Sequence, residues 1–369
     1  MRSNHNHNDG GGHWDLVVVG ASFAGAACAL AARRAGLRVC VIERKRDPGI
    51  KLHTTGIIVK EAAEQTLLSR IPAAYTRRVD GVRLYAPALH SRRLQRADYY
   101  FLTTDTPAVM RWLADQLIVA GVEMRLMQSF TDARRHDGGW LIDGLGHARW
   151  LVGADGAKSR VAARTGLDPV RDFLYGVEYE YAGLQLREPD ALHCFISKRY
   201  APGYIGWAAQ GPTGVQFGLA FRHDARRSGV PDIQGLLARV GPSLGIAPDT
   251  PPTATRAGLI PCGGAVRRMT APGVILTGDA AGIVSPVTAG GIHSAWRHGE
   301  MVGDAIARYV VDGGPSPERI AGTMAPRFRG KKLLRMAFDR LQADWPFDLL
   351  LHSSPLRWAA ERVYFSRRR

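Results

Sequence analysis

The sequence has no long apolar segment, few cysteines, and fewer acidic than basic residues among its 369 positions. No stretch approaches the roughly 18 uninterrupted apolar residues typical of a transmembrane helix, so we expect no membrane-spanning segment. Residues 1–12 are polar and rich in Asn, His and Gly, with no apolar signal core. We therefore expect a disordered leader and a cytoplasmic protein.

Only four cysteines are present, and none belongs to a C-x-x-C pair. Cys28 and Cys40 fall in an expected helix and an expected strand, where small core residues are typical. Cys194 and Cys262 each stand alone. The pattern predicts neither a disulfide framework nor a structural zinc, and we expect no metal site.

Basic residues exceed acidic ones, 49 against 33, for a formal net charge of +16. Such an excess is one sign of nucleic-acid binding. Here the basic residues are dispersed, with no recognised nucleic-acid module and no basic patch interleaved with aromatics. We therefore expect no nucleic-acid partner.

A glycine-rich turn follows the first apolar run, residues 16–19, and precedes a helix-favouring segment, residues 26–34. The apolar run is typical of a buried parallel strand. Gly20 permits the turn, and Gly25 lets the helix and the strand approach each other closely. The N-terminus of the helix then offers backbone N–H groups to a pyrophosphate. A serine stands at the second glycine position of the usual G-x-G-x-x-G. The residues expected to bind the ADP half are Gly20, Ser22, Phe23, Ala24 and Gly25.

A second apolar strand, residues 37–43, ends at Glu43, 18 residues after Gly25. About 20 residues is the usual spacing for a carboxylate that binds a ribose hydroxyl. Arg44 follows directly, and we expect Lys51 to reach the pyrophosphate. Together these features predict a dinucleotide-binding domain, and the alternative is an ordinary α/β turn with a surface glutamate.

A second glycine-rich segment lies far along the chain, after the apolar run 271–277. Its aspartate is placed to hold a ribityl hydroxyl, and a glycine pair then precedes an expected helix. Such a helix N-terminus presents N–H groups and a positive dipole end, which suits the N1–C2=O edge of an isoalloxazine. A nicotinamide dehydrogenase needs only the first segment, whereas an extended FAD needs both. The residues expected here are Gly278, Asp279, Pro286, Gly290, Gly291 and Ile292.

The two segments resemble the flavoprotein superfamily of p-hydroxybenzoate hydroxylase and the geranylgeranyl reductases, whose members carry G-D-A-A-G…P…G-G/E-G-I in the second position. The segment around Asp155 is similar to the superfamily's D-G motif, although Ala162 replaces the usual arginine. Arg111 resembles the arginine that begins a helix and contacts FAD, and the alternative is a solvated helix charge. The resemblance covers residues 13–310 and implies FAD, with NAD(P)H or another electron donor as reductant.

The resemblance also implies an α/β fold in which a Rossmann-like FAD-binding domain carries an inserted, mainly antiparallel β-sheet substrate domain and a helical C-terminal segment. Glu178 and Glu180 alternate with tyrosines, as in a strand of that sheet. We expect the sheet to cover the flavin, with a hydrophobic small-molecule substrate between sheet and ring. The predicted boundaries are 13–82, 105–165 and 255–320 for the FAD-binding domain, 83–104 and 166–254 for the substrate domain, and 321–369 for a basic helical segment.

The segment 200–211 resembles the geranylgeranyl reductase substrate motif P-x-x-Y-x-W-x-F-P, and we expect Tyr204 and Trp207 to form the substrate wall. Its spacing departs from the motif by one residue on each side of the tyrosine. The alternative is a hairpin whose aromatics pack in the core. His53 stands where the family has a cysteine–glycine stretch. With His293, it is best placed to face the flavin as a proton donor, and a structural histidine is the alternative.

The resemblance implies an FAD-dependent oxidoreductase that reduces a C=C bond of an isoprenoid or other hydrophobic substrate by hydride transfer from reduced flavin. The alternative is an FAD-dependent aromatic monooxygenase that uses NAD(P)H and molecular oxygen, since both share the FAD motifs. Halogenation is disfavoured because no W-x-W-x-I-P motif is present. A third interpretation also stays open, in which the protein is not an enzyme and binds FAD as a structural or redox-sensing ligand.

The end of the sequence is basic and amphipathic in residues 326–335 and 355–369. In the second stretch, apolar residues recur at helical spacing beside Trp358, Tyr364 and Phe365. One interpretation is a helix lying on an anionic membrane surface, where each basic residue contributes about 1 kcal/mol. The other is a helix packed on the body with a solvated face. The oligomeric state is left open.

Overall fold

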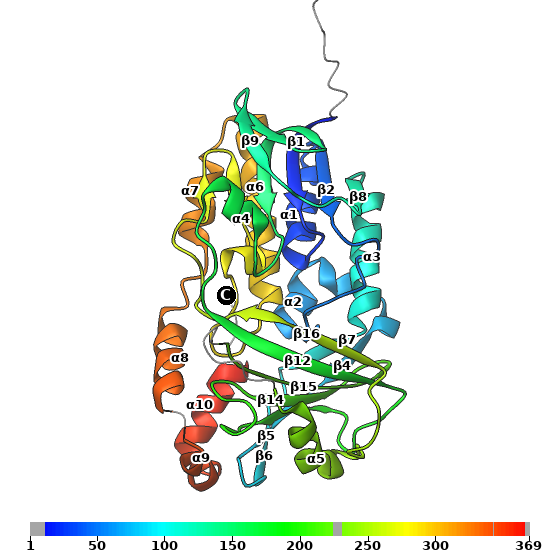
Figure 1. Cartoon of the computed structure of the whole chain (residues 1–369), viewed down its shortest axis with the longest axis vertical. Coiled ribbons are helices and arrows are strands. Elements are labelled where there is room, and N and C mark those ends of the chain that lie inside the picture. Colours follow the sequence, from blue (N-terminus) through cyan, green and yellow to red (C-terminus); the bar gives the residue numbers. More distant parts are fainter. Residues whose placement is uncertain (1–11, 224–230, 342, 366–369) are drawn as a thin grey trace, which may run out of the picture.

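The computed structural model describes residues 12–223, 231–341 and 343–365. Residues 1–11 of the expected leader lie outside this part, and Gly12 already begins the first strand, paired with Gly146. Two main layers make up the molecule (Figure 1). A Rossmann-like parallel sheet with its helices lies at one end, and a mainly antiparallel sheet crosses the other.

The first sheet has eight strands, and its central path runs β17-β18-β11-β1-β2-β8. Strands β18, β11, β1, β2 and β8 are parallel, while β9 and β10 add an antiparallel hairpin. Because helices cover its faces, the central strands are continuous apolar runs. The bounds are β1 (Gly12–Val19), β2 (Val39–Glu43), β8 (Glu123–Leu126), β9 (Ala133–His136), β10 (Gly139–Ile142), β11 (Gly146–Gly153), β17 (Thr270–Ala271) and β18 (Val274–Leu276).

Two helices cover the centre of this sheet in close contact: α1 (Phe23–Arg34) and α6 (Ile292–Asp312). Glycines make the contact possible. A Cβ added at Gly299 would lie 2.2 Å from the carbonyl oxygen of Ala24, and one at Gly303 equally close to that of Cys28. The α6 backbone therefore rests directly on α1, which holds the two glycine-rich segments at fixed separation.

The second sheet has seven strands in the order β16-β12-β15-β14-β13-β5-β6. Every pair is antiparallel except β5 with β13. Helix α5 (Ile233–Leu244) packs leucines against Phe217 and Leu219 on the face away from the parallel sheet. The predicted fold class is confirmed. The bounds are β5 (Gly81–Tyr85), β6 (Ser91–Gln95), β12 (Phe173–Ala182), β13 (Ala191–Phe195), β14 (Gly206–Gln210), β15 (Gly214–Arg222) and β16 (Ala254–Pro261).

A three-stranded sheet, β3-β7-β4, joins the two layers. Its strand β7 (Phe101–Thr104) was expected among the substrate-domain strands, but it pairs with β3 (Ile58–Val59) and β4 (Thr76–Val79). A short apolar run indicates a strand but not its partner, which accounts for the difference. The predicted domain boundaries stay a prediction. The neighbouring helices are α2 (Lys60–Gln65), α3 (Thr106–Val119) and α4 (Arg160–Thr165).

The end of the chain forms four helices, α7 (Pro317–Met324), α8 (Arg329–Leu341), α9 (Trp345–Leu350) and α10 (Ser354–Phe365). The last helix packs on the body, with Phe365 fully buried against Tyr99 and Phe101. Phe365 is therefore not available to a membrane surface, contrary to the bilayer interpretation of that side chain. Trp358 is 64% exposed. No helix in the described ranges combines the length and apolar character needed to cross a membrane.

Candidate flavin and substrate site

A cavity of about 380 Å³ lies between the two main sheets. One side is made by the start of α1, the turn after β18 and the start of α6. The other side is made by strands β12, β13, β14 and β16, and the end of α10 also reaches it. Segments that are hundreds of residues apart in the sequence therefore share one space.

The first glycine-rich turn forms the corner of the cavity. Gly20 has φ +103°, and a Cβ there would lie 2.5 Å from the carbonyl oxygen of Ala154. Ser22 caps α1 by accepting a hydrogen bond from the Gly25 N–H at 3.2 Å, and its hydroxyl donates to the same Ala154 oxygen at 3.1 Å. The serine thus replaces the usual glycine with a side chain that joins α1 to the end of β11. Of the predicted ADP-binding residues, Ser22, Phe23 and Ala24 line the cavity.

Glu43 is buried at the end of β2, beside that turn. Its carboxylate accepts hydrogen bonds from the Ala21 N–H at 3.1 Å and the Lys45 N–H at 3.0 Å. These bonds hold the acid next to the pyrophosphate-binding turn, where a ribose would lie. Arg44 is exposed.

The other predicted basic contacts lie at the surface, outside the cavity lining. Arg111 donates from Nη2 to the Asp47 carboxylate at 2.7 Å, and from Nε at about 3 Å. This pair holds the pKa of Asp47 below its usual value and fastens the loop after β2 to α3. Lys51, in the same loop, is exposed and has φ +48°. Their contact with FAD stays a prediction.

Asp155 lies at the end of β11 and points at α4 rather than into the cavity. Its Oδ2 accepts from the N–H groups of Arg160 at 2.7 Å and Val161 at 3.2 Å. Burial raises the pKa of this carboxyl. The next residue, Gly156, does line the cavity. In this structure the D-G motif therefore shapes the β11–α4 turn.

The second glycine-rich segment faces the first across the cavity corner. A Cβ at Gly278 would lie 2.8 Å from the Cβ of Ala24, so a side chain would close the gap between the two segments. Asp279 lines the cavity, and burial raises its pKa to about 6. A carboxylate lacking strong partners here fits a ligand hydroxyl, as predicted for the ribityl chain.

Helix α6 begins at the cavity with Gly291 as its N-cap residue and no side-chain capping bond. The first N–H groups of a 21-residue helix are therefore available to a ligand with negative charge, as an isoalloxazine edge is. Gly290 and Ile292 line the cavity beside Gly291. Pro286, in the loop before α6, and His293, in the first turn of α6, are buried and do not line the cavity. His293 is thus not placed at the cavity as the predicted proton donor.

The opposite wall carries the two predicted aromatics. Tyr204 is buried and donates a hydrogen bond from its hydroxyl to the carbonyl oxygen of Thr288 at 2.6 Å. Trp207 donates from Nε1 to Glu178 Oε2 at 3.0 Å. His53 also lines the cavity, where its Nδ1 lies 2.7 Å from the carbonyl oxygen of Ala257. Three of the four predicted catalytic residues therefore share the cavity, and their catalytic roles stay a prediction.

Several lining residues were not found from the sequence. They share no motif and come from strand faces, a connecting loop and the last helix: Thr54, Thr55, Glu178, Cys194, Arg256 and Tyr364. For Glu178, the alternation of acids with tyrosines gave the strand but not the direction of its faces. The acidic face of β12 is turned inward, so Glu178 is only 4% exposed. No three His, Cys, Asp or Glu side chains gather into a metal site within the described ranges.

Fold and site together define an FAD-binding protein. Two glycine-rich turns, an acid beside each turn, and a helix N-terminus without a side-chain cap are arranged around one cavity. Comparison with known families agrees. Residues 15–168 match the family model of FAD-dependent oxidoreductases, and residues 144–320 match that of an FAD-binding domain.

Named relatives are similar to the chain over most of its length. The chain is 29% identical over 317 residues to digeranylgeranylglycerophospholipid reductase 2 of Methanopyrus kandleri, covering 80% of this chain and 78% of that protein. It is 27% identical to the protein of the same name from Methanothermobacter thermautotrophicus, covering 92% and 91%. The crystal structure of a geranylgeranyl bacteriochlorophyll reductase-like protein from Thermoplasma acidophilum superposes with a TM-score of 0.81 over 96% of both chains, at 16% identity. The chain is thus an FAD-dependent oxidoreductase, and its sequence is similar to those of digeranylgeranylglycerophospholipid reductases.

Proposed function

We propose that this enzyme reduces a C=C bond in a hydrophobic isoprenoid substrate. The observation that carries the proposal is the cavity, whose sheet side is lined mainly by apolar groups: Val177, Leu192, Ile205, Ala208 and Ile260. An apolar chain entering this space loses contact with water, at about 25 cal/mol per Å² of apolar surface. The names of the relatives, reductases of geranylgeranyl groups, support the same substrate class.

The roles of the chain's own residues follow from their places. Ser22, Glu43 and the start of α1 bind the ADP half of FAD, and Asp279 binds its ribityl chain. The uncapped start of α6 stabilises negative charge on the flavin ring. Bound in this way, the reduced cofactor supplies a hydride to one alkene carbon. The sheet holds that carbon against the ring and excludes water.

The alternative, an aromatic monooxygenase, would use the same FAD-binding residues. Reduction is the better supported of the two because the named relatives are reductases and the sheet wall presents apolar groups to the substrate. As electron donor we propose NAD(P)H or a protein-borne reductant. The donor is identified by anaerobic mixing of oxidised enzyme with each candidate while the flavin absorbance is followed.

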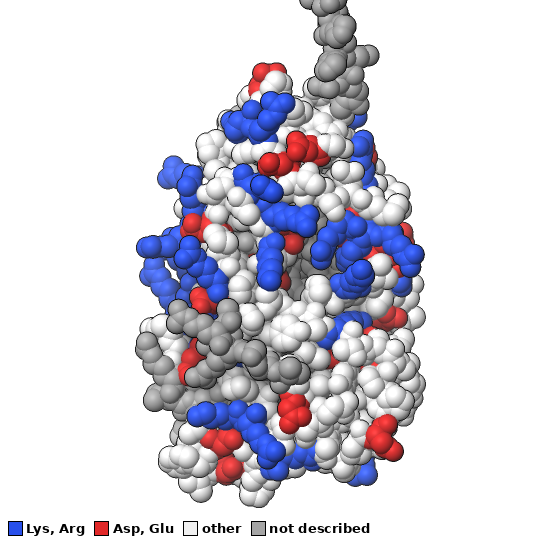
Figure 2. Space-filling model, in the orientation of Figure 1, with Lys and Arg blue, Asp and Glu red and all other residues white. Residues whose placement is uncertain are grey.

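We also propose that the enzyme takes its substrate from a membrane surface through α8 and α9. Large apolar side chains are exposed on both helices. Basic residues accompany them in α8, and Lys and Arg side chains are dispersed over the face of the molecule drawn in Figure 2. Exposed aromatic and aliphatic groups beside positive charge favour an anionic bilayer surface. The exposed apolar residues are Leu333, Leu334, Met336, Trp345, Leu349 and Leu350.

Product analysis tests the reductase proposal. The protein is loaded with FAD, kept reduced by dithionite without oxygen, and mixed with a lipid bearing geranylgeranyl chains. The expected product has gained two hydrogens for each double bond reduced, as seen by mass spectrometry. Unchanged lipid, together with oxygen-dependent hydroxylation of an aromatic compound, would overturn the proposal.

A further inference from the structure

Two carboxyl side chains line the cavity within the described part of the chain, and they lie at different ends of it. Asp279 lies beside the first turn of α1, in the FAD-binding segment. Glu178 lies on the sheet wall, among the apolar groups proposed to hold the substrate. Addition of hydrogen to an alkene requires a proton as well as a hydride, so the nature of this second acid bears on the chemistry.

Glu178, on β12, is held by a side chain that lies two strands away in the sheet. On β15 its register partner is Gly218, and on β14 the partner of Gly218 is Trp207. A Cβ at Gly218 would lie 2.5 Å from the Trp207 ring. The missing side chain therefore lets the indole cross β15 and donate from Nε1 to Glu178 Oε2 at 3.0 Å.

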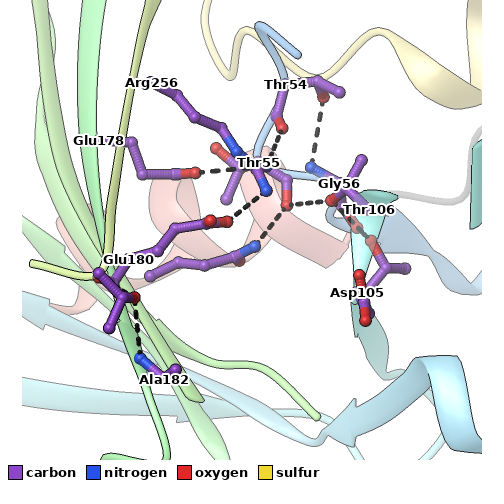
Figure 3. Close-up of polar contacts among 12 residues, drawn as sticks. Thr54, Thr55, Gly56, Asp105, Thr106, Glu178, Glu180, Ala182 and Arg256 are labelled. Atoms are coloured by element: carbon purple, nitrogen blue, oxygen red, sulfur yellow. Dashed lines mark hydrogen bonds and ion pairs between the residues drawn. The ribbon is translucent and has the colours of Figure 1, made fainter. Parts of the chain in front are cut away.

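The other side of the carboxyl faces the loop after β2. The Thr55 hydroxyl is hydrogen-bonded to Glu178, and Arg256 Nη1 lies 3.9 Å from Oε1 (Figure 3). Arg256 is itself occupied elsewhere, since it donates to the carbonyl oxygen of Thr54 at 3.1 Å and pairs with Glu180. Its charge is thus shared with a second acid. Glu178 has no cation of its own at hydrogen-bonding distance.

Two other possible proton donors on this wall, Tyr204 and His53, each have a contact with a main-chain carbonyl oxygen. The Tyr204 hydroxyl is bonded to Thr288, and Nδ1 of His53 lies against Ala257. Burial raises the pKa of Tyr204 well above its ordinary value, which makes it a poor acid at neutral pH. Burial also raises the pKa of Glu178, so the carboxyl stays protonated to a higher pH than a solvent-exposed glutamate does.

We propose that Glu178 is the general acid that protonates the alkene carbon opposite the one that receives the hydride. This inference rests on the proposed reductase function. One alkene carbon forms a C–H bond with the hydride from reduced flavin, which is thereby oxidised. The π electron pair forms the second C–H bond with the Glu178 proton, leaving a carboxylate that solvent protonates again. Trp207 and Thr55 position the carboxyl and stabilise it after proton loss.

The groups that face Glu178 fix the expected pH dependence. They are Arg256 on β16, Glu180 on β12, and the neutral Trp207 and Thr55. Burial raises the pKa of Glu178 and is the largest effect. The hydrogen bonds from Thr55 and Trp207 and the charge of Arg256 lower this pKa, and the charge of Glu180 raises it. The acid form is needed, so the rate is highest at low pH and falls as pH rises through that raised pKa.

The test compares wild type with Glu178→Gln, which keeps the shape and removes the acid. In anaerobic single turnovers with a geranylgeranyl lipid, flavin reoxidation in the variant is expected to be at least about a hundredfold slower, with the pH dependence lost. Glu178→Asp recovers part of the rate. Glu64→Gln, an exposed change on α2, is the matched control. Variant reoxidation at the wild-type rate with an unchanged pH profile would overturn the proposal.

Two further measurements separate this proposal from the reductase function. Infrared pH titration of the protein without substrate is expected to show a carboxylic-acid carbonyl band that persists above the usual pKa range of a glutamate and that Glu178→Gln removes. A wild-type band that is lost within that usual range would overturn the role of Glu178, whatever the substrate. Gly218→Ala, which displaces Trp207, is expected to slow reoxidation while FAD still binds. If wild type itself is not reoxidised by lipid, the reductase function fails, and the infrared band still reports on the acid.

Discussion

The Tyr204 hydroxyl and the carbonyl oxygen of Thr288 form a 2.6 Å hydrogen bond between the β13–β14 connection of the antiparallel sheet and the loop that precedes α6. The residues are 84 positions apart, and both line the cavity. The bond fixes the distance between the substrate wall and Gly290–Gly291, where the flavin ring is proposed to lie. Tyr204 is predicted from the sequence as a substrate contact. In the structure its hydrogen bond connects the substrate wall to the loop before α6.

Loss of the Tyr204–Thr288 hydrogen bond is expected to weaken flavin binding. Tyr204→Phe leaves the half-buried Thr288 carbonyl without this donor, at a cost of about 1 kcal/mol. FAD titration by quenching of flavin fluorescence is expected to show a dissociation constant roughly tenfold higher, with lower thermal stability. Tyr309→Phe removes an exposed hydroxyl on α6 and is the control. Unchanged affinity in Tyr204→Phe would show that the loop holds its place without the sheet.

The α1–α6 contact is expected to tolerate no side chain at Gly299. In Gly299→Ala the new Cβ meets the Ala24 carbonyl at 2.2 Å, so the helices must separate, at a cost of about 1–3 kcal/mol. Urea unfolding of the FAD-free protein measures this loss. Gly322→Ala, in α7, meets nothing within 4 Å and is expected to be neutral or slightly stabilising. Equal midpoints for the two variants would contradict the packing argument.

Asp279 is expected to make the FAD-free protein less stable as pH rises. Burial raises its folded-state pKa to about 6 from 3.8, so folding favours the protonated acid. Stability is therefore fully present below about pH 4 and is lost as pH rises through about 6, by about 3 kcal/mol. Asp279→Asn removes this dependence and weakens FAD binding. Urea unfolding at several pH values measures it, and a wild-type–variant difference that is constant across pH would exclude the effect.

Membrane contact through α9 is expected to depend on its exposed apolar groups. Replacing Trp345 and Leu349 by serine removes two side chains that are 68% and 73% exposed. Co-sedimentation with vesicles containing anionic lipid is expected to fall several-fold, with unchanged turnover of detergent-dispersed substrate. The control is Val119→Ser, an equally exposed position on α3. Equal sedimentation of the double variant and the control would remove α9 from the contact.

Local pattern was sufficient to predict the FAD-binding half of the fold. The strands that end at Val19 and Glu43 are buried on both faces, so their apolar runs are continuous, and each glycine turn follows such a run. The buried Glu43 next to the first turn likewise follows from its spacing. The α1–α6 contact was missed, although its signal is present as small residues four apart, Gly299 and Gly303.

The substrate wall could not be predicted in the same way. Glu178 alternates with tyrosines, and a strand with acids on one face usually turns that face to water. Here the tyrosine face is covered by α5 and its neighbours, and the acid face encloses the cavity. Tyr364 reaches the cavity only because α10 returns to the body. The inward direction of the acidic face and the position of Tyr364 both depend on long-range packing, which a local sequence pattern does not indicate.

The most direct test of the account is anaerobic flavin spectroscopy. The purified protein is loaded with FAD, reduced with one equivalent of dithionite, and mixed with a lipid bearing geranylgeranyl chains. We predict that the bleached flavin absorbance returns without oxygen, in proportion to the double bonds reduced. Absorbance that returns only when air is admitted would contradict the assignment as an alkene reductase.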